Sequence, residues 1–138
     1  MKLDAKKIFI GGVAAGAAIL VVSFIVDSVI TALLPYNMLE LGGMRSPEDP
    51  LMLLFFLHPW VLGFGMSTAF QKFKPAFRST GWCRGKAFGI YVWLLAGLPS
   101  AFIVYTSMNY PIGFTASSLL GSLLYMAAAG ITLEKVAA

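Results

Sequence analysis

The apolar stretch over residues 8–34 constrains the fold of this chain most, because it holds one charged residue and ends at Pro35. A helix over it reaches about 40 Å at 1.5 Å per residue, more than the ~30 Å hydrocarbon core of a bilayer. Of the 138 residues, 59% are hydrophobic and 12% charged, whereas a soluble domain carries about 25% charged residues. We therefore expect a bilayer to be the solvent for most of the chain, and this first helix to tilt or to leave the bilayer.

Basic residues precede this stretch, as they do in a secretory signal peptide: Lys2, Lys6 and Lys7. The apolar run is far longer than the roughly 7–15 residues of a signal-peptide core, so we interpret it as an uncleaved membrane helix. The net charge of +4 does not indicate nucleic-acid binding, because the basic residues form short clusters beside apolar runs. The sole cysteine, Cys83, permits neither an intramolecular disulfide nor a cysteine-based metal cluster.

Four apolar stretches predict membrane helices, at about residues 8–34, 51–70, 87–108 and 112–133. Pro59 and Pro99 lie inside the second and third stretches, where a membrane helix tolerates proline at the cost of a kink. The turn formed by Asn109, Tyr110 and Pro111 is so short that the last two helices must be antiparallel neighbours. The predicted fold class is an all-α membrane protein, a four-transmembrane-helix antiparallel bundle forming one membrane domain over residues 1–138.

Orientation follows from the distribution of lysine and arginine, which favour the cytoplasmic side in short loops. The N-terminus and the predicted loop 71–86 are basic, whereas the connection at residues 35–50 has only Arg45 among several acidic residues. We expect both termini in the cytoplasm and the protein in the cytoplasmic membrane of a prokaryote. Residues of the basic loop and its border are expected to anchor to anionic lipid head groups or to dock a cytoplasmic partner: Lys72, Lys74, Arg78, Trp82, Arg84 and Lys86.

Asp27 and His58 are the readily ionisable side chains inside the apolar stretches. Opposite directions of travel place both about 10 Å below the outer boundary of the bilayer, and Ser118 and Ser122 reach roughly that depth in the fourth helix. A carboxylate and an imidazole at membrane depth suit a proton or ion site. A structural interpretation stays open beside it: Asp27 at the outer head groups, and His58 bonded to a carbonyl that Pro59 frees.

Small residues mark the faces by which these helices are expected to pack. Gly12 and Gly16 share a face with Asp27, and Gly65 shares one with His58. Gly89 and Gly121 are further packing positions in the third and fourth helices. These contacts are expected within one bundle or between chains of an oligomer.

The second half of the chain resembles small four-helix membrane proteins of prokaryotes. The resemblance covers roughly residues 84–130 and rests on the spacing of these residues: Arg84, Gly85, Phe88, Gly89, Trp93, Pro99, Tyr105, Met108, Tyr110, Pro111 and Gly130. It implies a four-helix fold and brings no activity and no site residues.

The sequence contains no Ser-His or HExxH arrangement, and a lone histidine with a lone intramembrane aspartate is too little to specify a reaction. With one histidine, only mixed ligation or dimerisation could supply both axial ligands of a haem. We expect no cofactor, no bound metal and no enzymatic activity. The first hypothesis is an oligomeric component or accessory subunit of a membrane complex. The alternative is a proton, ion or small-solute channel or transporter that uses Asp27 and His58.

Overall fold

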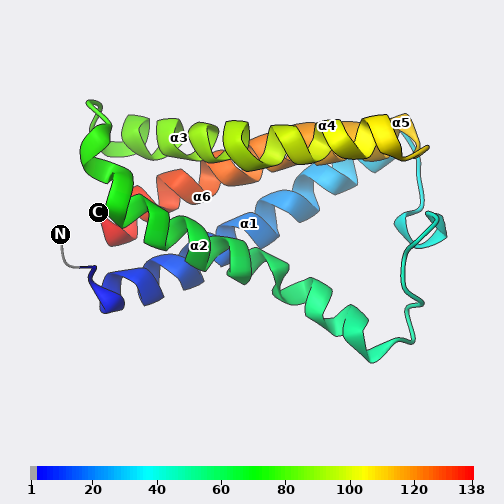
Figure 1. Cartoon of the computed structure of the whole chain (residues 1–138), viewed down its shortest axis with the longest axis horizontal. Coiled ribbons are helices and arrows are strands. Elements are labelled where there is room, and N and C mark those ends of the chain that lie inside the picture. Colours follow the sequence, from blue (N-terminus) through cyan, green and yellow to red (C-terminus); the bar gives the residue numbers. More distant parts are fainter. Residues whose placement is uncertain (1–2) are drawn as a thin grey trace.

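The computed structural model describes residues 3–138, and within them four helices are long and apolar enough to cross a membrane (Figure 1). These spans are Ala5–Leu33, Pro50–Ala76, Gly81–Ser107 and Ile112–Ala137. The prediction of four apolar helices is confirmed. Both chain termini lie at one end of the molecule, where the Lys7 ammonium donates to the Ala138 carbonyl over 2.9 Å. We call this the terminal end and the opposite end the loop end.

The first span is the uninterrupted helix α1 (Ala5–Leu33), and the other three are composite. The second consists of η2 (Pro50–Leu57), α2 (His58–Phe73) and η3 (Lys74–Ala76). The third consists of α3 (Gly81–Val92), the π-helical η4 (Trp93–Gly97) and α4 (Leu98–Ser107). The fourth consists of α5 (Ile112–Ala116), the π-helical η5 (Ser117–Gly121) and α6 (Ser122–Ala137). The short helix η1 (Met38–Glu40) lies in the connection between the first two spans.

Two predicted details differ from the structure. The predicted loop 71–86 is mostly helical, and only residues 77–80 separate the second span from the third. Lysine and arginine side chains lay their apolar stems along a helix and keep their charges in water, so a helix can continue through such residues. Pro59 and Pro99 lie inside continuous spans, but the helix changes from 3₁₀ to α just before Pro59 and from π to α just before Pro99.

The first two spans cross where three glycines meet. A Cβ added to Gly63 would lie 2.6 Å from both the Gly12 carbonyl oxygen and the Gly16 amide nitrogen. The two backbones therefore touch, as small residues permit between membrane helices. Beyond this crossing the spans diverge, and η2 lies apart from the other spans at the loop end (Figure 1).

The third and fourth spans pack closely along α3 and α6. A Cβ on Gly85 would lie 2.5 Å from the Gly130 carbonyl oxygen, and one on Gly130 would overlap the Gly85 carbonyl. Nearer the terminal end, the Arg84 guanidinium donates to both carboxylate oxygens of Glu134 over 2.8 and 2.5 Å. Since α1 packs against both α2 and α6, it joins the two pairs of spans.

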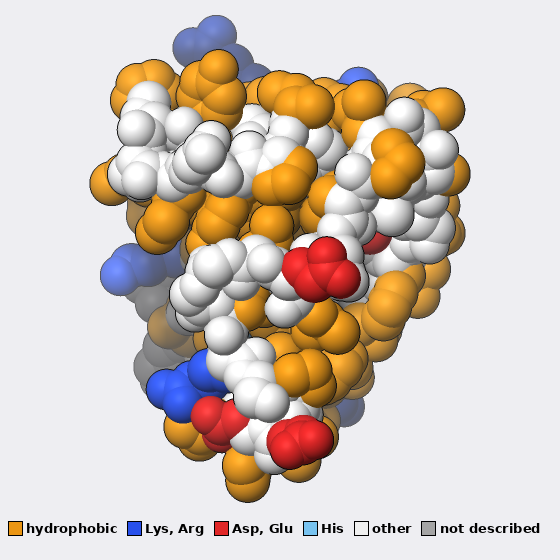
Figure 2. All heavy atoms as spheres, turned by 90° about the vertical axis from the view of Figure 1, so that its right-hand side faces the viewer, with side chains coloured by type: hydrophobic (Ala, Val, Ile, Leu, Met, Phe, Trp, Pro, Cys, Tyr) orange, Lys and Arg blue, Asp and Glu red, His pale blue; other side chains and the backbone are white. Residues whose placement is uncertain are grey.

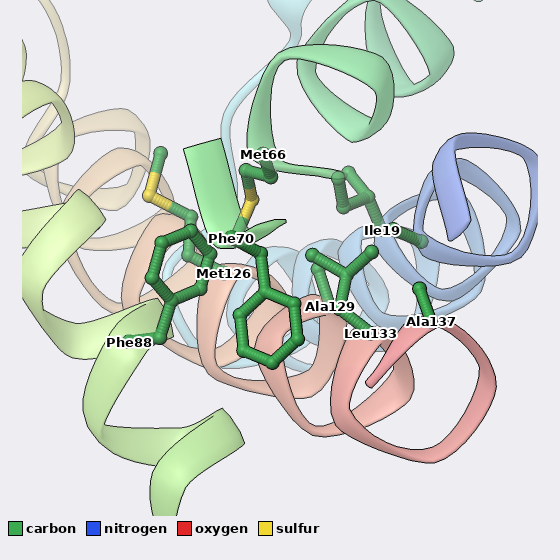
Figure 3. Close-up of a cluster of buried hydrophobic side chains, with 9 residues drawn as sticks. Ile19, Met66, Phe70, Phe88, Met126, Ala129, Leu133 and Ala137 are labelled. Atoms are coloured by element: carbon green, nitrogen blue, oxygen red, sulfur yellow. The ribbon is translucent and has the colours of Figure 1, made fainter. Parts of the chain in front are cut away.

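The buried core lies in the terminal half and takes side chains from all four spans (Figure 3). Phe70 of α2 and Phe88 of α3 meet edge to face with ring centroids 5.1 Å apart. Around them lie further buried residues: Ala15, Ile19, Met66, Met126, Ala129, Leu133 and Ala137. This core fills the space between the spans at the terminal end, whereas the crossing of α1 and α2 leaves the loop end more open.

Candidate functional site

A cavity of about 560 Å³ lies in the loop-end half, between the first, second and fourth spans. It is located where η2 diverges from α1, and Ile19 of the buried core lines it. Aromatic side chains from all three spans and from the first connection contribute to its wall: Phe24, Tyr36, Phe55, Phe56, Phe114 and Tyr125. The backbone crossing at Gly63 thus produces the opening that these rings line.

Asp27 of α1 is the hydrogen-bonding centre of this cavity. Its Oδ1 accepts from the Ser117 hydroxyl of η5 and from the Tyr36 hydroxyl, the latter over 3.2 Å. Within residues 3–138, its Oδ2 accepts no hydrogen bond from the protein. One carboxylate therefore ties together the first span, the fourth span and the connection that follows α1, and keeps one oxygen for another partner.

The Tyr36 phenol is a stable donor to this carboxylate. Burial raises the pKa of Tyr36 above its ordinary value, and the nearby Asp27 charge raises that pKa further. The phenol therefore keeps its proton throughout the physiological pH range. The ring also meets Phe114 edge to face at 5.9 Å, which fixes its position on the cavity wall.

The π-helical segments of the third and fourth spans contact each other beside the cavity. The Trp93 indole of η4 donates to the Leu119 carbonyl over 3.2 Å and to the Ser122 hydroxyl over 3.0 Å. Ser122 is therefore engaged with the third span, whereas Ser118 lines the cavity together with Ser117. A single π turn inside an α-helix is frequent at functional sites, and here it carries the hydroxyl that binds Asp27.

His58 lines the same cavity as Asp27, at the start of α2. Within residues 3–138, its ring forms no hydrogen bond with Asp27 or with a carbonyl near Pro59. It also lines a smaller cavity of about 330 Å³ that extends along α2 to Val92 of the third span. The structure thus gathers Asp27, His58 and Ser118 at one cavity, and joins Asp27 directly to Ser117 and Tyr36.

The loop end of the molecule is acidic, in contrast to the terminal end. Figure 2 views this end and shows acidic side chains among the apolar ones. The first connection contains three acidic residues, Glu40, Glu48 and Asp49, and one basic residue, Arg45. Arg45 pairs with Asp49 over 2.9 Å. The Leu51 amide and then the Arg45 guanidinium lower the pKa of Asp49, so its carboxylate stays charged at neutral pH.

The predicted packing glycines fall into two groups. A Cβ on Gly16 would lie 2.6 Å from Cδ1 of Trp60, a Cβ on Gly12 would overlap Phe64, and a Cβ on Gly89 would overlap the Met126 carbonyl. These three mark close approaches between spans. A Cβ on Gly121 would lie 3.6 Å from Val26 Cγ1, an ordinary van der Waals distance. Gly65 is exposed, and no atom lies within 4 Å of a Cβ added there.

The predicted lipid-anchoring residues lie at the terminal end. Lys72, Lys74, Arg78, Trp82 and Lys86 lie around the connection between the second and third spans. The Lys86 ammonium is 5.4 Å from the Trp82 ring centroid, a cation–π contact. Arg84 differs from the others because its guanidinium is paired with Glu134, and the two side chains are only 17% and 8% exposed.

Residues 3–138 contain no group of three or more His, Cys, Asp or Glu side chains that could hold a metal ion. The chemistry available at the cavity is therefore one carboxylate, one imidazole and several hydroxyls, set among aromatic rings. Such a set can bind a solute or exchange a proton.

The fold places this chain in the class of multi-pass membrane proteins, because its four spans have the length and apolar character to cross a bilayer. No protein-family model matches the chain, and comparisons with curated proteins and with solved structures give no match either.

Proposed function

We propose that the four spans form an antiparallel bundle in a prokaryotic cytoplasmic membrane, with both termini in the cytoplasm. The charge distribution supports this orientation, because lysine and arginine favour the cytoplasmic side. Basic residues gather at the terminal end: Lys6, Lys7, Lys72, Lys74, Arg78, Arg84, Lys86 and Lys135. In this orientation the cavity lies in the outer half of the membrane and faces the acidic connection.

We propose further that the protein is not an enzyme and that it binds a small solute in this cavity as a step in its permeation. The observation that carries the proposal is the convergence of Asp27, Ser117, Tyr36 and His58 on one cavity of about 560 Å³. Its volume falls within the roughly 300–1,000 Å³ of ligand pockets. An ionisable side chain at membrane depth usually marks a pathway or a pair, and within residues 3–138 Asp27 pairs with no cation of the protein.

Cysteine accessibility tests whether the cavity is open to solute. Both variants are made in a Cys83→Ser background. Ser118→Cys places a thiol on the cavity wall. Leu120→Cys places a thiol two residues further along the chain, where the native side chain is 51% exposed on the outside of the bundle. We expect a small cationic thiol reagent, added outside, to modify Ser118→Cys and to leave the lipid-facing Leu120→Cys unmodified. Equal resistance of both thiols would contradict an open cavity.

A second thiol reagent, too bulky to pass through the cavity, tests the orientation on the native chain. Cys83 is exposed at the terminal end, so a membrane-impermeant reagent should modify it only after the cells are permeabilised. Modification of Cys83 in intact cells would reverse the proposed topology.

The exposed apolar surface of η2 supports a second candidate function. η2 makes few close backbone contacts with the other three spans, and its large apolar side chains are exposed, Leu53 by 70%. A surface of this kind suits a role as an oligomer or as an accessory subunit that packs against a membrane partner. Purification in native lipid discriminates the two: a stoichiometric membrane partner favours the subunit, and a chain that purifies without one favours solute binding.

A further inference from the structure

We propose that the solute bound in this cavity is an organic cation with an apolar body. The inference rests on the proposed solute-binding function and adds the chemical class of the ligand. Three features carry it: the charge on the cavity wall, the rings around that charge, and the charge of the loop end.

The wall of the cavity favours a positive ligand. Among the described residues that line it, Asp27 is the only acidic one, and neither lysine nor arginine is present. Ser117 and Tyr36 donate to Oδ1, so the carboxylate is held in place while Oδ2 has no partner within residues 3–138. The basic residue on the same wall, His58, forms no hydrogen bond with Asp27 within residues 3–138. A fixed carboxylate with a free oxygen and no bound protein cation is a site for an external cation.

The rings of the cavity favour a cation that is also apolar. Six aromatic side chains line it, and the face of such a ring attracts a cation while its area covers an apolar body. Tyr36 and Phe114 touch edge to face, as do Phe55 and Phe56 at 6.0 Å, so rings stand on walls formed by different spans.

A metal ion fits this wall poorly. Hard cations require several oxygen ligands around one point, and the described residues supply no cluster of three acidic, histidine or cysteine side chains. A cavity of about 560 Å³ is also far larger than a bare ion. An organic cation uses the whole cavity, because its charge meets Asp27 and its body meets the rings.

The charge of the loop end, on whose side the cavity lies, is consistent with such a ligand. The acidic side chains of the first connection, Glu40, Glu48 and Asp49, outnumber Arg45, the basic residue beside them. A surface of negative charge around an apolar cleft raises the local concentration of cations and repels anions. A cation approaching from the loop end therefore meets attraction before it reaches Asp27.

Two ions of equal shape and opposite charge test the inference: tetraphenylphosphonium and tetraphenylborate. Binding of each is measured by equilibrium dialysis to the full chain in phosphatidylcholine nanodiscs, with empty nanodiscs subtracted. We expect saturable binding of the phosphonium, and Asp27→Asn should weaken it at least about tenfold because a desolvated charge pair is lost. Glu48→Gln, which removes a carboxylate of the first connection outside the cavity, should leave the phosphonium affinity within about twofold.

Each other outcome decides against the inference in a distinct way. Equal affinity for the two ions, or phosphonium binding that Asp27→Asn leaves unchanged, would show an apolar cavity that ignores charge, and solute binding would still stand. Absence of saturable binding of both ions overturns the inference. The labelling of the Ser118→Cys thiol then tests the proposed function separately. If Asp27→Asn does not fold, the comparison of the two ions on the native chain still decides the question.

Discussion

Gly130→Ala is expected to lower the melting temperature of the purified protein markedly in detergent. The added Cβ would overlap the Gly85 carbonyl oxygen and lie 2.9 Å from the Gly89 amide nitrogen. These are backbone atoms of α3, so no side chain can rotate away and the two helices must separate. Overpacking of this kind costs at least about 2 kcal/mol, which exceeds the ~1 kcal/mol by which alanine favours a helix over glycine.

Gly65→Ala is the matched control for this prediction. It makes the same substitution inside a helix, but no atom lies within 4 Å of the new Cβ. We expect its melting temperature to equal or exceed that of the native chain, because only the helix preference changes. Equal melting temperatures for Gly130→Ala and Gly65→Ala would contradict the close packing of α3 against α6.

Glu134→Gln is expected to destabilise the protein by about 1–2 kcal/mol, measured as a loss of unfolding free energy in mixed micelles. Glu134 accepts both hydrogen bonds from Arg84, and the two side chains are 8% and 17% exposed. The neutral amide leaves the guanidinium charge without its partner in a place that little water reaches. The double variant Arg84→Met, Glu134→Met should recover much of the loss, because it leaves no unpaired charge.

Arg45→Gln is the matched control for Glu134→Gln, because it breaks a solvent-exposed ion pair, Arg45–Asp49. Arg45 also pairs with a carboxylate at 2.9 Å, but its side chain is 59% exposed. Exposed pairs of this kind contribute little to stability, so we expect almost no change. A larger effect from Arg45→Gln than from Glu134→Gln would contradict the structural role given to the Arg84–Glu134 pair.

Sequence reasoning predicted the number and approximate place of the spans, because long apolar stretches have few alternatives in a bilayer. It ended the second span too early and began the third too late, because helices continue through basic residues such as Lys72 and Arg84. It did not predict the 3₁₀ segment η2 before Pro59 or the π segment η4 before Pro99. Hydropathy cannot show this, because a 3₁₀ or π turn has the same composition as the helix around it.

The candidate site was predicted in part. The depth argument selected Asp27, His58 and Ser118, and all three line one cavity. It also selected Ser122, which instead bonds with Trp93. It did not select Ser117 and Tyr36, the two partners of Asp27.

These omissions have physical reasons. The π turn of η5 changes which serine faces α1, and regular helical spacing cannot reveal such a turn. Tyr36 lies in a connection whose path depends on tertiary contacts. A tyrosine soon after a membrane aspartate was the one available signal, because its hydroxyl needs a partner when the ring is buried.

The central claim is that Asp27 lies on the wall of a solute-accessible cavity, and carbodiimide labelling tests it most directly. The native chain in lipid is treated with dicyclohexylcarbodiimide, which partitions into bilayers, and adducts are located by mass spectrometry. The account predicts an adduct on Asp27 that excess tetraphenylphosphonium prevents, and none on Glu134, whose side chain is 8% exposed and paired with Arg84. An unlabelled Asp27, or labelling of Asp27 and Glu134 to the same extent, would contradict it.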